Sequence, residues 1–187
     1  MGGGVVERLW AGWRMSYIAK AQGSSGGSGG SGRSKAKAPC LFCDLAKGRA
    51  GLRNLVLAKT PEVLVVMNRY PYNVGHVMVA PRRHLGSIAS LTPGEAIEIT
   101  RWIGRAERAL RKAYRPDGFN IGMNLGRAAG AGVLGHLHWH IVPRWNGDTN
   151  FMPVTAATKV LPEALDQTYR KLLGALVAGA PKRRRRR

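Results

Sequence analysis

The sequence predicts an α+β fold, in which a mainly antiparallel five-stranded sheet is accompanied by one long central helix and one C-terminal helix. Two observations lead to this prediction: short apolar runs bounded by turn residues recur along the chain, and two longer stretches have helical spacing. The chain has 187 residues, of which 44% are hydrophobic. That is enough for one compact domain with a core of its own.

The predicted strands occupy five segments in order. The stretches NLVLAKT (54–60) and VLVVMN (63–68) meet at a turn around Pro61 and Glu62, and GHVMVAP (75–81) forms the third strand. The last two are GFNIGMNLG (118–126) and HLHWHIVPR (136–144), joined by the glycine-rich GRAAGAG (126–132).

A long helix is predicted over residues 92–114. Thr92 is its N-cap candidate, Pro93 takes the first helical position, and Glu95 completes a capping box. The helical spacing continues through Ile99, Ile103, Ala106 and Leu110. The C-terminal helix is predicted from about Pro162 to Ala178, with an apolar stripe of Leu165, Tyr169, Leu172, Leu173 and Leu176.

Outside this domain, predicted over residues 40–180, the composition changes. Residues 1–21 form an aromatic arm that is too apolar to stay exposed without a partner surface. Residues 22–39 are rich in glycine and serine and then basic, which predicts a flexible linker. Residues 181–187 form a basic tail that we expect to be disordered.

The formal net charge is +20, and the tail KRRRRR supplies six of these charges. Such a tail is either a solvated segment with no defined role or a contact for nucleic acid. No apolar run approaches the roughly 20 residues needed to cross a bilayer. The N-terminus does not have the pattern of a signal peptide, so we expect a cytoplasmic protein.

Two features carry the chemistry. The only cysteines, Cys40 and Cys43, stand three apart, a spacing that favours metal ligation or redox chemistry in a reducing compartment. Histidines at 136, 138 and 140 alternate with apolar residues, so a strand would place three imidazoles on one face. These imidazoles could hold a metal, perform chemistry or divide the two tasks.

The segment HLHWHIV resembles the signature of the histidine triad (HIT) superfamily of nucleotide hydrolases and transferases. The segments NRYPYNVGHVMVAPRRH and DGFNIGMNLG, with the helix between them, occur in the same order as in that family, so the resemblance covers roughly residues 40–145. The segments PRWNGDTNFMPV and RLWAGWRMSYI are most similar to the bacterial branch that includes diadenosine tetraphosphate phosphorylases. The resemblance implies a HIT-like fold and a homodimer formed through the long helix and a strand edge.

By this resemblance His138 is the nucleophile, and it would attack an α-phosphorus to form a nucleotidyl-histidine intermediate. Water or inorganic phosphate would then release the nucleoside phosphate. His140 matches the position that supports the phosphate. An imidazole suits the attack because its reference pKa of ~6.5 leaves it mostly neutral at pH 7.

The resemblance also implies substrate-binding positions. They are Asn68 for ribose, Asn124 with the amides from Gly130 to Gly132 for the α-phosphate, and His76 near the site. The simpler alternatives are asparagines that satisfy local turns and a structural His76. The glutamine that many hydrolase members carry four residues before the first triad histidine is replaced here by Gly132. This departure favours the phosphorylase-like branch over Hint-like or Fhit-like members.

A structural zinc site with four ligands is the last implication of the resemblance. Its ligands would be Cys40, Cys43, His84 and His136; the alternative is a reduced, buried cysteine pair beside a surface histidine. The sequence thus predicts a zinc-containing enzyme that cleaves dinucleoside polyphosphates at the α-phosphate. The alternatives are a Hint-type hydrolase of purine nucleoside phosphoramidates and nucleotides, a nucleic-acid-binding triad protein that uses its basic tail, and a degenerate interaction module.

Overall fold

The computed structural model describes residues 40–148 and 161–178. The predicted aromatic arm (1–21), linker (22–39) and basic tail (181–187) lie outside the described residues.

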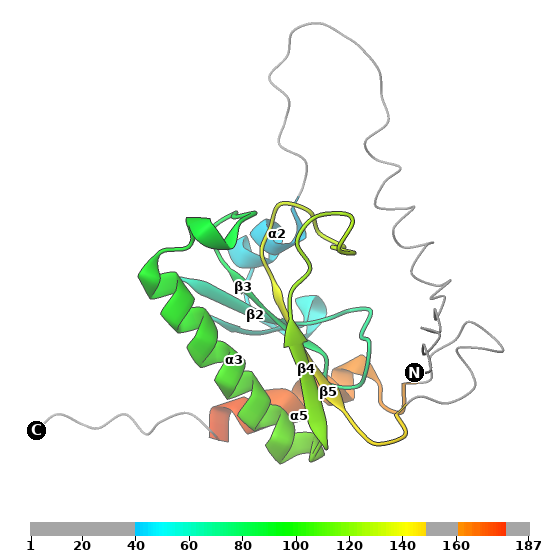
Figure 1. Cartoon of the computed structure of the whole chain (residues 1–187). Coiled ribbons are helices and arrows are strands. Elements are labelled where there is room, and N and C mark those ends of the chain that lie inside the picture. Colours follow the sequence, from blue (N-terminus) through cyan, green and yellow to red (C-terminus); the bar gives the residue numbers. More distant parts are fainter. Residues whose placement is uncertain (1–39, 149–160, 179–187) are drawn as a thin grey trace, which may run out of the picture. The chain divides into compact units, whose positions relative to one another are not determined.

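The described part is built on one five-stranded antiparallel sheet, as predicted (Figure 1). Its strands are β1 (Val56–Lys59), β2 (Val63–Met67), β3 (Val77–Pro81), β4 (Gly118–Gly122) and β5 (Trp139–Arg144). Their order across the sheet is β1-β2-β3-β5-β4, so the last strand in sequence lies between β3 and β4. Every residue of β2 and β3 is buried, which makes these two strands the centre of the core.

The long helix α3 (Pro93–Tyr114) confirms the predicted central helix and its N-terminal cap. The Thr92 hydroxyl accepts the backbone N–H of Glu95 at 3.2 Å, and the Glu95 carboxylate accepts the N–H of Thr92 at 2.9 Å. Reciprocal capping of this kind satisfies two backbone donors that the first helical turn leaves without partners. The buried face of α3 carries Ile99 and Leu110 and packs against β2, β3 and β5.

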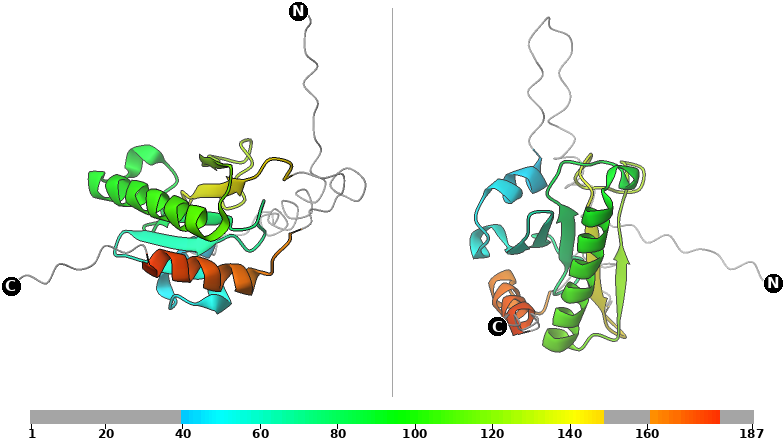
Figure 2. Two further views of the ribbon diagram at one scale, coloured as in Figure 1. Left: turned by 90° about the horizontal axis from the view of Figure 1, so that it is seen from below. Right: turned by 90° about the vertical axis from the view of Figure 1, so that its left-hand side faces the viewer.

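The C-terminal helix α5 (Leu165–Ala178) begins at Leu165 rather than at the predicted Pro162. It packs against α3 and β1, and Figure 2 shows it at the side of the described part where β1 lies. The buried hydroxyl of Tyr169 donates to the carbonyl of Val56 at 3.0 Å. The helix therefore closes the core at the β1 end of the sheet.

Three short helical segments complete the described chain. They are the helix α2 (Leu41–Lys47) and two single-turn 3-10 helices, Leu52–Asn54 and Ile88–Ser90. The helix α2 holds Cys43 and follows Cys40 directly, and it was not predicted from the sequence. None of the helices in the described ranges is both long and apolar enough to cross a membrane.

The strand predicted over 136–144 is wrong at its beginning, because β5 starts only at Trp139. Its pairing with β3 ends at Val79, opposite Trp139. Pro81, further along β3, has no N–H to offer to a ladder, and its carbonyl is taken by the His136 side chain at 2.8 Å. His136 and His138 therefore stand on the extended segment before the strand, and only His140 lies in it.

Candidate functional site

The site forms where the carboxyl end of β3 lies beside the beginning of β5. His76 directly precedes β3 and His84 follows it, while His136 and His138 lead into β5. The antiparallel register, with Met78 opposite His140, brings these segments together although they are far apart in the sequence. All five histidines of the chain contribute to this region.

Four side chains at this end of the sheet form a cluster with metal-ligand character. One ligand atom from each of Cys40, Cys43, His84 and His136 lies within 4.8 Å of all the others. The Nδ1 atom of His136 is 3.2 Å from the Cys40 sulfur and 3.6 Å from the Cys43 sulfur. The Nδ1 atom of His84 is 3.3 Å from the Cys43 sulfur.

These spacings fit a tetrahedral zinc ion. Zinc bonds of ~2.3 Å to sulfur and ~2.05 Å to nitrogen place neighbouring S and N ligands roughly 3.5 Å apart. The Nε2 of His136 faces the carbonyl oxygen of Pro81, which can only accept, so this nitrogen carries the proton. The Nδ1 lone pair is therefore directed at the two sulfurs, an arrangement common among histidine metal ligands.

The protonation preferences differ between the two residue types of this cluster. Burial, followed by the hydrogen bond with Cys40, raises the pKa of the Cys43 thiol. Burial lowers the pKa of His136, which therefore stays neutral at pH 7. Neutral imidazole is the form that binds a metal, and a divalent cation would favour the thiolates.

The imidazole of His138 is oriented in the opposite way. Its Nδ1 lies 2.9 Å from the carbonyl oxygen of His136, so the Nδ1 carries the proton and the Nε2 presents a lone pair. Burial lowers the pKa of His138, since only 4% of the residue is exposed. The result is a neutral imidazole with a defined tautomer, which is what a nucleophile of this type requires.

His140 is held by a second histidine. The backbone N–H of Tyr72 donates to Nδ1 of His76 at 3.1 Å, so a neutral His76 carries its proton on Nε2. That Nε2 lies 2.9 Å from Nδ1 of His140 and donates to it. Burial, followed by the charges of His140 and His138, lowers the pKa of His76 to about 3, which keeps it in this neutral form.

Phe42 of α2 lies between the two kinds of histidine. Its ring centroid is 5.2 Å from that of His136 and 4.8 Å from that of His138. The ring of His138 in turn meets His140 edge-on, with centroids 4.9 Å apart. The helix that carries Cys43 is thus packed directly against the imidazole that presents its Nε2.

The predicted phosphate-binding and ribose-binding residues make local contacts. The Asn68 side-chain oxygen accepts the N–H of Tyr70 at 2.9 Å, and the Asn124 amide donates to the carbonyl of Gly130 at 3.4 Å. The N–H of Gly130 donates to the carbonyl of Arg127 at 2.9 Å. In this conformation the side chains of Asn68 and Asn124 each bond to a backbone group of their own loop.

Sequence reasoning missed the anchor of the loop that carries His84. Arg83 donates to both oxygens of the buried Glu95 carboxylate, at 2.7 and 2.8 Å. The Arg83 guanidinium holds the pKa of Glu95 at about 2, well below its usual range. The capping-box position of Glu95 was visible in the sequence, but its pairing with Arg83 was not, because the two residues meet only after β3 and α3 have packed.

Comparisons with known proteins place these features in a family. Residues 51–147 match the HIT domain family. An AP-4-A phosphorylase of Mycobacterium tuberculosis is 38% identical over 167 residues, which cover 89% of this chain and 83% of that protein.

Solved structures show the same fold. A zinc-bound histidine triad family protein of Mycobacterium smegmatis superposes with a TM-score of 0.59 at 25% identity, covering 74% of this chain and 94% of that protein. A histidine triad nucleotide-binding protein of Sulfolobus tokodaii gives a TM-score of 0.60 at 22% identity, covering 74% of this chain and 93% of the other. A uridylyltransferase shares the fold at 14% identity, with a TM-score of 0.62 over 91% of this chain and 52% of that protein.

Proposed function

This chain belongs to the HIT domain family, and from that premise we propose that it cleaves dinucleoside polyphosphates, such as diadenosine tetraphosphate, at an α-phosphate. The observation that carries the proposal is the fixed tautomer of His138, whose neutral Nε2 is directed away from the carbonyl of His136. The 38% identity to an AP-4-A phosphorylase supports the substrate class.

The proposed reaction has two displacements at one phosphorus atom. In the first, the Nε2 lone pair of His138 forms a P–N bond, and the bond from the α-phosphorus to the bridging oxygen breaks with its electron pair on the departing polyphosphate. The Nδ1–H bond to the His136 carbonyl stabilises the positive charge that develops on the imidazole. In the second, phosphate or water attacks the phosphorus, and the P–N electrons return to Nε2.

The neighbouring groups are proposed to bind the phosphate and the ribose. His140, with its Nδ1 occupied by His76, would present an Nε2–H to a phosphate oxygen. Asn124 and the amide of Gly132 would bind the α-phosphate, while Gly130, at a φ of +79°, shapes the loop. Asn68 would contact the ribose.

Zinc is proposed as a structural ion held by Cys40, Cys43, His84 and His136. A zinc ion with four protein ligands neutralises two thiolates and cross-links distant segments, and it keeps no open position for water. In this protein it would tie α2 to the segment that carries His138. The zinc-bound relative supports this assignment.

A homodimer is also proposed, with β4 and α3 at its interface. The strand β4 forms one edge of the sheet, and Ile121 on it and Ile97 on α3 are both about half exposed. A strand edge with exposed apolar groups is a ready surface for a second copy. Analytical ultracentrifugation tests this; a monomer at micromolar concentration would contradict it. A cytoplasmic location is proposed as well, and the two free cysteines support it because a reducing compartment keeps thiols unpaired.

The experiment that tests the function is product analysis. The purified protein is incubated with diadenosine tetraphosphate, with and without inorganic phosphate, and the products are separated by chromatography. ADP plus ATP in the presence of phosphate identifies phosphorolysis, whereas AMP plus ATP identifies hydrolysis. Turnover of a nucleoside phosphoramidate with none of diadenosine tetraphosphate would contradict the proposal and indicate a Hint-type enzyme.

A further inference from the structure

The helix α3 carries a row of basic residues that the nucleotide chemistry does not use. Arg101, Arg105, Arg108 and Lys112 follow one another at intervals of four, three and four residues. At 3.6 residues per turn, these positions share one face of a helix. The row therefore places a line of positive charge along the length of α3.

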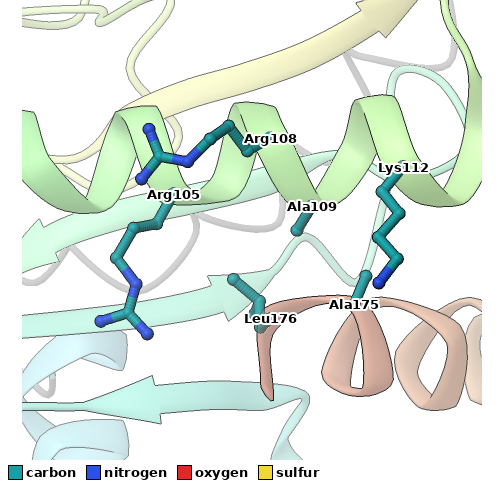
Figure 3. A pocket seen from close by; sticks show the side chains of 6 residues that line it. All are labelled: Arg105, Arg108, Ala109, Lys112, Ala175 and Leu176. Carbon is teal, nitrogen blue, oxygen red and sulfur yellow. The ribbon is translucent and has the colours of Figure 1, made fainter. Parts of the chain in front are cut away.

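Three members of this row line a pocket between α3 and α5. Arg105, Arg108 and Lys112 form its α3 side, Ala109 lies at its floor, and Ala175 and Leu176 form its α5 side. Figure 3 shows Arg105 and Lys112 extending from α3 toward α5, with the apolar side chains between them. The pocket volume is about 170 Å³. We call this feature the α3–α5 groove.

The charge of this groove is not neutralised within the described residues. No carboxylate of the described ranges lies within ion-pair distance of Arg105, Arg108 or Lys112. By contrast, the neighbouring Arg101 pairs with Glu98 at 3.6 Å and Arg111 with Glu107 at 2.9 Å. Arg101 and Arg111, next to the groove, therefore have carboxylate partners, whereas the cations that line the groove have none among the described residues.

One contact orients an arginine of the groove. The Arg105 guanidinium lies 3.9 Å from the ring centroid of the buried Trp102, which orients it by a cation–π interaction. The Arg108 guanidinium lies near Gly104, at 3.6 Å from the place a Cβ would take there, an ordinary contact distance. The Arg105 guanidinium is therefore positioned by a neighbour on the same helix.

The groove lies close in sequence to the basic tail. Leu176 stands in the last turn of α5, and Lys182, the first cation of the tail, follows it by six residues. Even a fully extended chain of this length spans at most about 20 Å. The tail therefore begins six residues after a residue that lines the groove.

We propose that the α3–α5 groove binds the phosphodiester backbone of a single-stranded nucleic acid. Along the helix axis, Arg105, Arg108 and Lys112 are spaced by about 4.5 and 6 Å, which suits contact with successive phosphates of one strand. Arginine forms paired hydrogen bonds with phosphate oxygens, and the apolar floor can accept the sugars. The pocket contains none of the histidines of the nucleotide site, so both ligands can bind together.

The groove and the edge strand β4 lie on different sides of α3. The helix α5 lies on one side of α3, whereas Arg111 on another side of α3 reaches over Phe119 of the edge strand β4. A partner that pairs with the edge of β4 would therefore approach from a different side of α3 than the groove, whereas Ile97 stands on the face of the basic row, about two turns before Arg105. Binding of nucleic acid at the groove does not require the proposed enzyme activity.

The test uses the full chain and a fluorescent 20-nucleotide poly(U) probe, with anisotropy measured over a range of salt concentrations. The triple variant Arg105→Gln, Arg108→Gln and Lys112→Gln is compared with the control Lys47→Gln, Arg49→Gln and Arg53→Gln. Each removes two arginines and one lysine, all six of them outside the nucleotide site. Cleavage of diadenosine tetraphosphate by the parent and both variants shows whether they are folded; thermal unfolding serves instead if the parent is inactive.

We expect the groove variant to bind about 100-fold more weakly at 0.1 M salt and its salt slope to decrease by about 2, because each single-strand phosphate contact contributes ~0.7 to the slope. The control should stay within about threefold of the parent. Equal weakening in both variants, or in neither, would overturn the proposal. The proposal would also be overturned if the parent bound inorganic polyphosphate more tightly than poly(U) and only the groove variant lost that binding. If the triple variant does not fold, Arg108→Gln alone should weaken binding about fivefold.

Discussion

Two histidines of the segment 136–140, His136 and His138, use the same side chain in opposite orientations. His136 directs its Nε2 to a backbone carbonyl and turns its Nδ1 toward two sulfurs. His138, two residues further on, directs its Nδ1 to a backbone carbonyl and leaves its Nε2 for another partner. Both sites use histidine. In the metal cluster a backbone carbonyl accepts from Nε2, and in the nucleotide site a backbone carbonyl accepts from Nδ1.

The two regions also differ in what surrounds them. Sulfur atoms and the exposed His84 surround the free nitrogen of His136, whereas His138 and His76 stand among other imidazoles and aromatic rings. The donor set in the first region suits a cation. Burial keeps imidazoles neutral in both regions, and in the second region a neutral imidazole surrounded by other rings suits attack on an electrophile.

The largest expected effect comes from a substitution that disables only the second region. His138→Ala should reduce cleavage of diadenosine tetraphosphate by about 10⁴-fold or more, because the nucleophile of the two-step pathway is lost. Its zinc content, measured by elemental analysis, should equal that of the parent protein. Full activity in this variant would remove the basis of the proposed mechanism.

Breaking the first region should have a large effect of a different kind. His136→Ala should lose zinc, and the free energy of unfolding should fall by about 3 kcal/mol or more, because the ion links α2 to the segment before β5. Cys43→Ser should have the same consequence, as should a strong chelator acting on the parent protein. Denaturant unfolding and zinc analysis measure both quantities. If His136→Ala kept its zinc, the assignment of this residue as a ligand would be wrong.

The pH dependence of stability should report the buried His76. Its pKa is about 3 in the folded protein and ~6.5 in the unfolded chain, so below pH 6.5 the unfolded chain takes up the proton first. The pKa difference of His76 has a negligible effect well above pH 6.5, and it lowers the free energy of unfolding by about 2 kcal/mol at pH 5. Urea unfolding from pH 7 to 5 measures it, with His76→Gln as the comparison. Equal pH slopes in the two proteins would contradict this role.

The smallest expected effect concerns the loop that holds His84. Glu95→Gln should lower the free energy of unfolding by about 1 to 2 kcal/mol, because it weakens a bidentate pair with Arg83 at the start of α3. Glu95 has a depressed pKa, so this loss should be present at pH 7 and vanish as the pH falls from 4.5 toward 2. The control Glu107→Gln removes a more exposed pair and should cost about 0.5 kcal/mol or less. Equal losses would show that the Arg83 pair does not anchor the loop.

Elements governed by local rules could be predicted from the sequence. Thr92, Pro93 and Glu95 lie within one turn of each other, so the start of α3 was visible without any tertiary information. The buried strands β2 and β3 were visible as short apolar runs between turns. The beginning of β5 was not, because it depends on Pro81 in another strand, which cannot continue the ladder.

The candidate site divides in the same way. The sequence by itself determined which residues are chemically competent: two cysteines at metal-ligand spacing and three alternating histidines. Their roles depend on contacts between distant segments, such as Cys40 with His136 and the Tyr72–His76–His140 chain of hydrogen bonds. Only the tertiary structure decided which nitrogen of each imidazole carries the proton, because the acceptor or donor that selects it comes from wherever the folded backbone places a carbonyl or an amide.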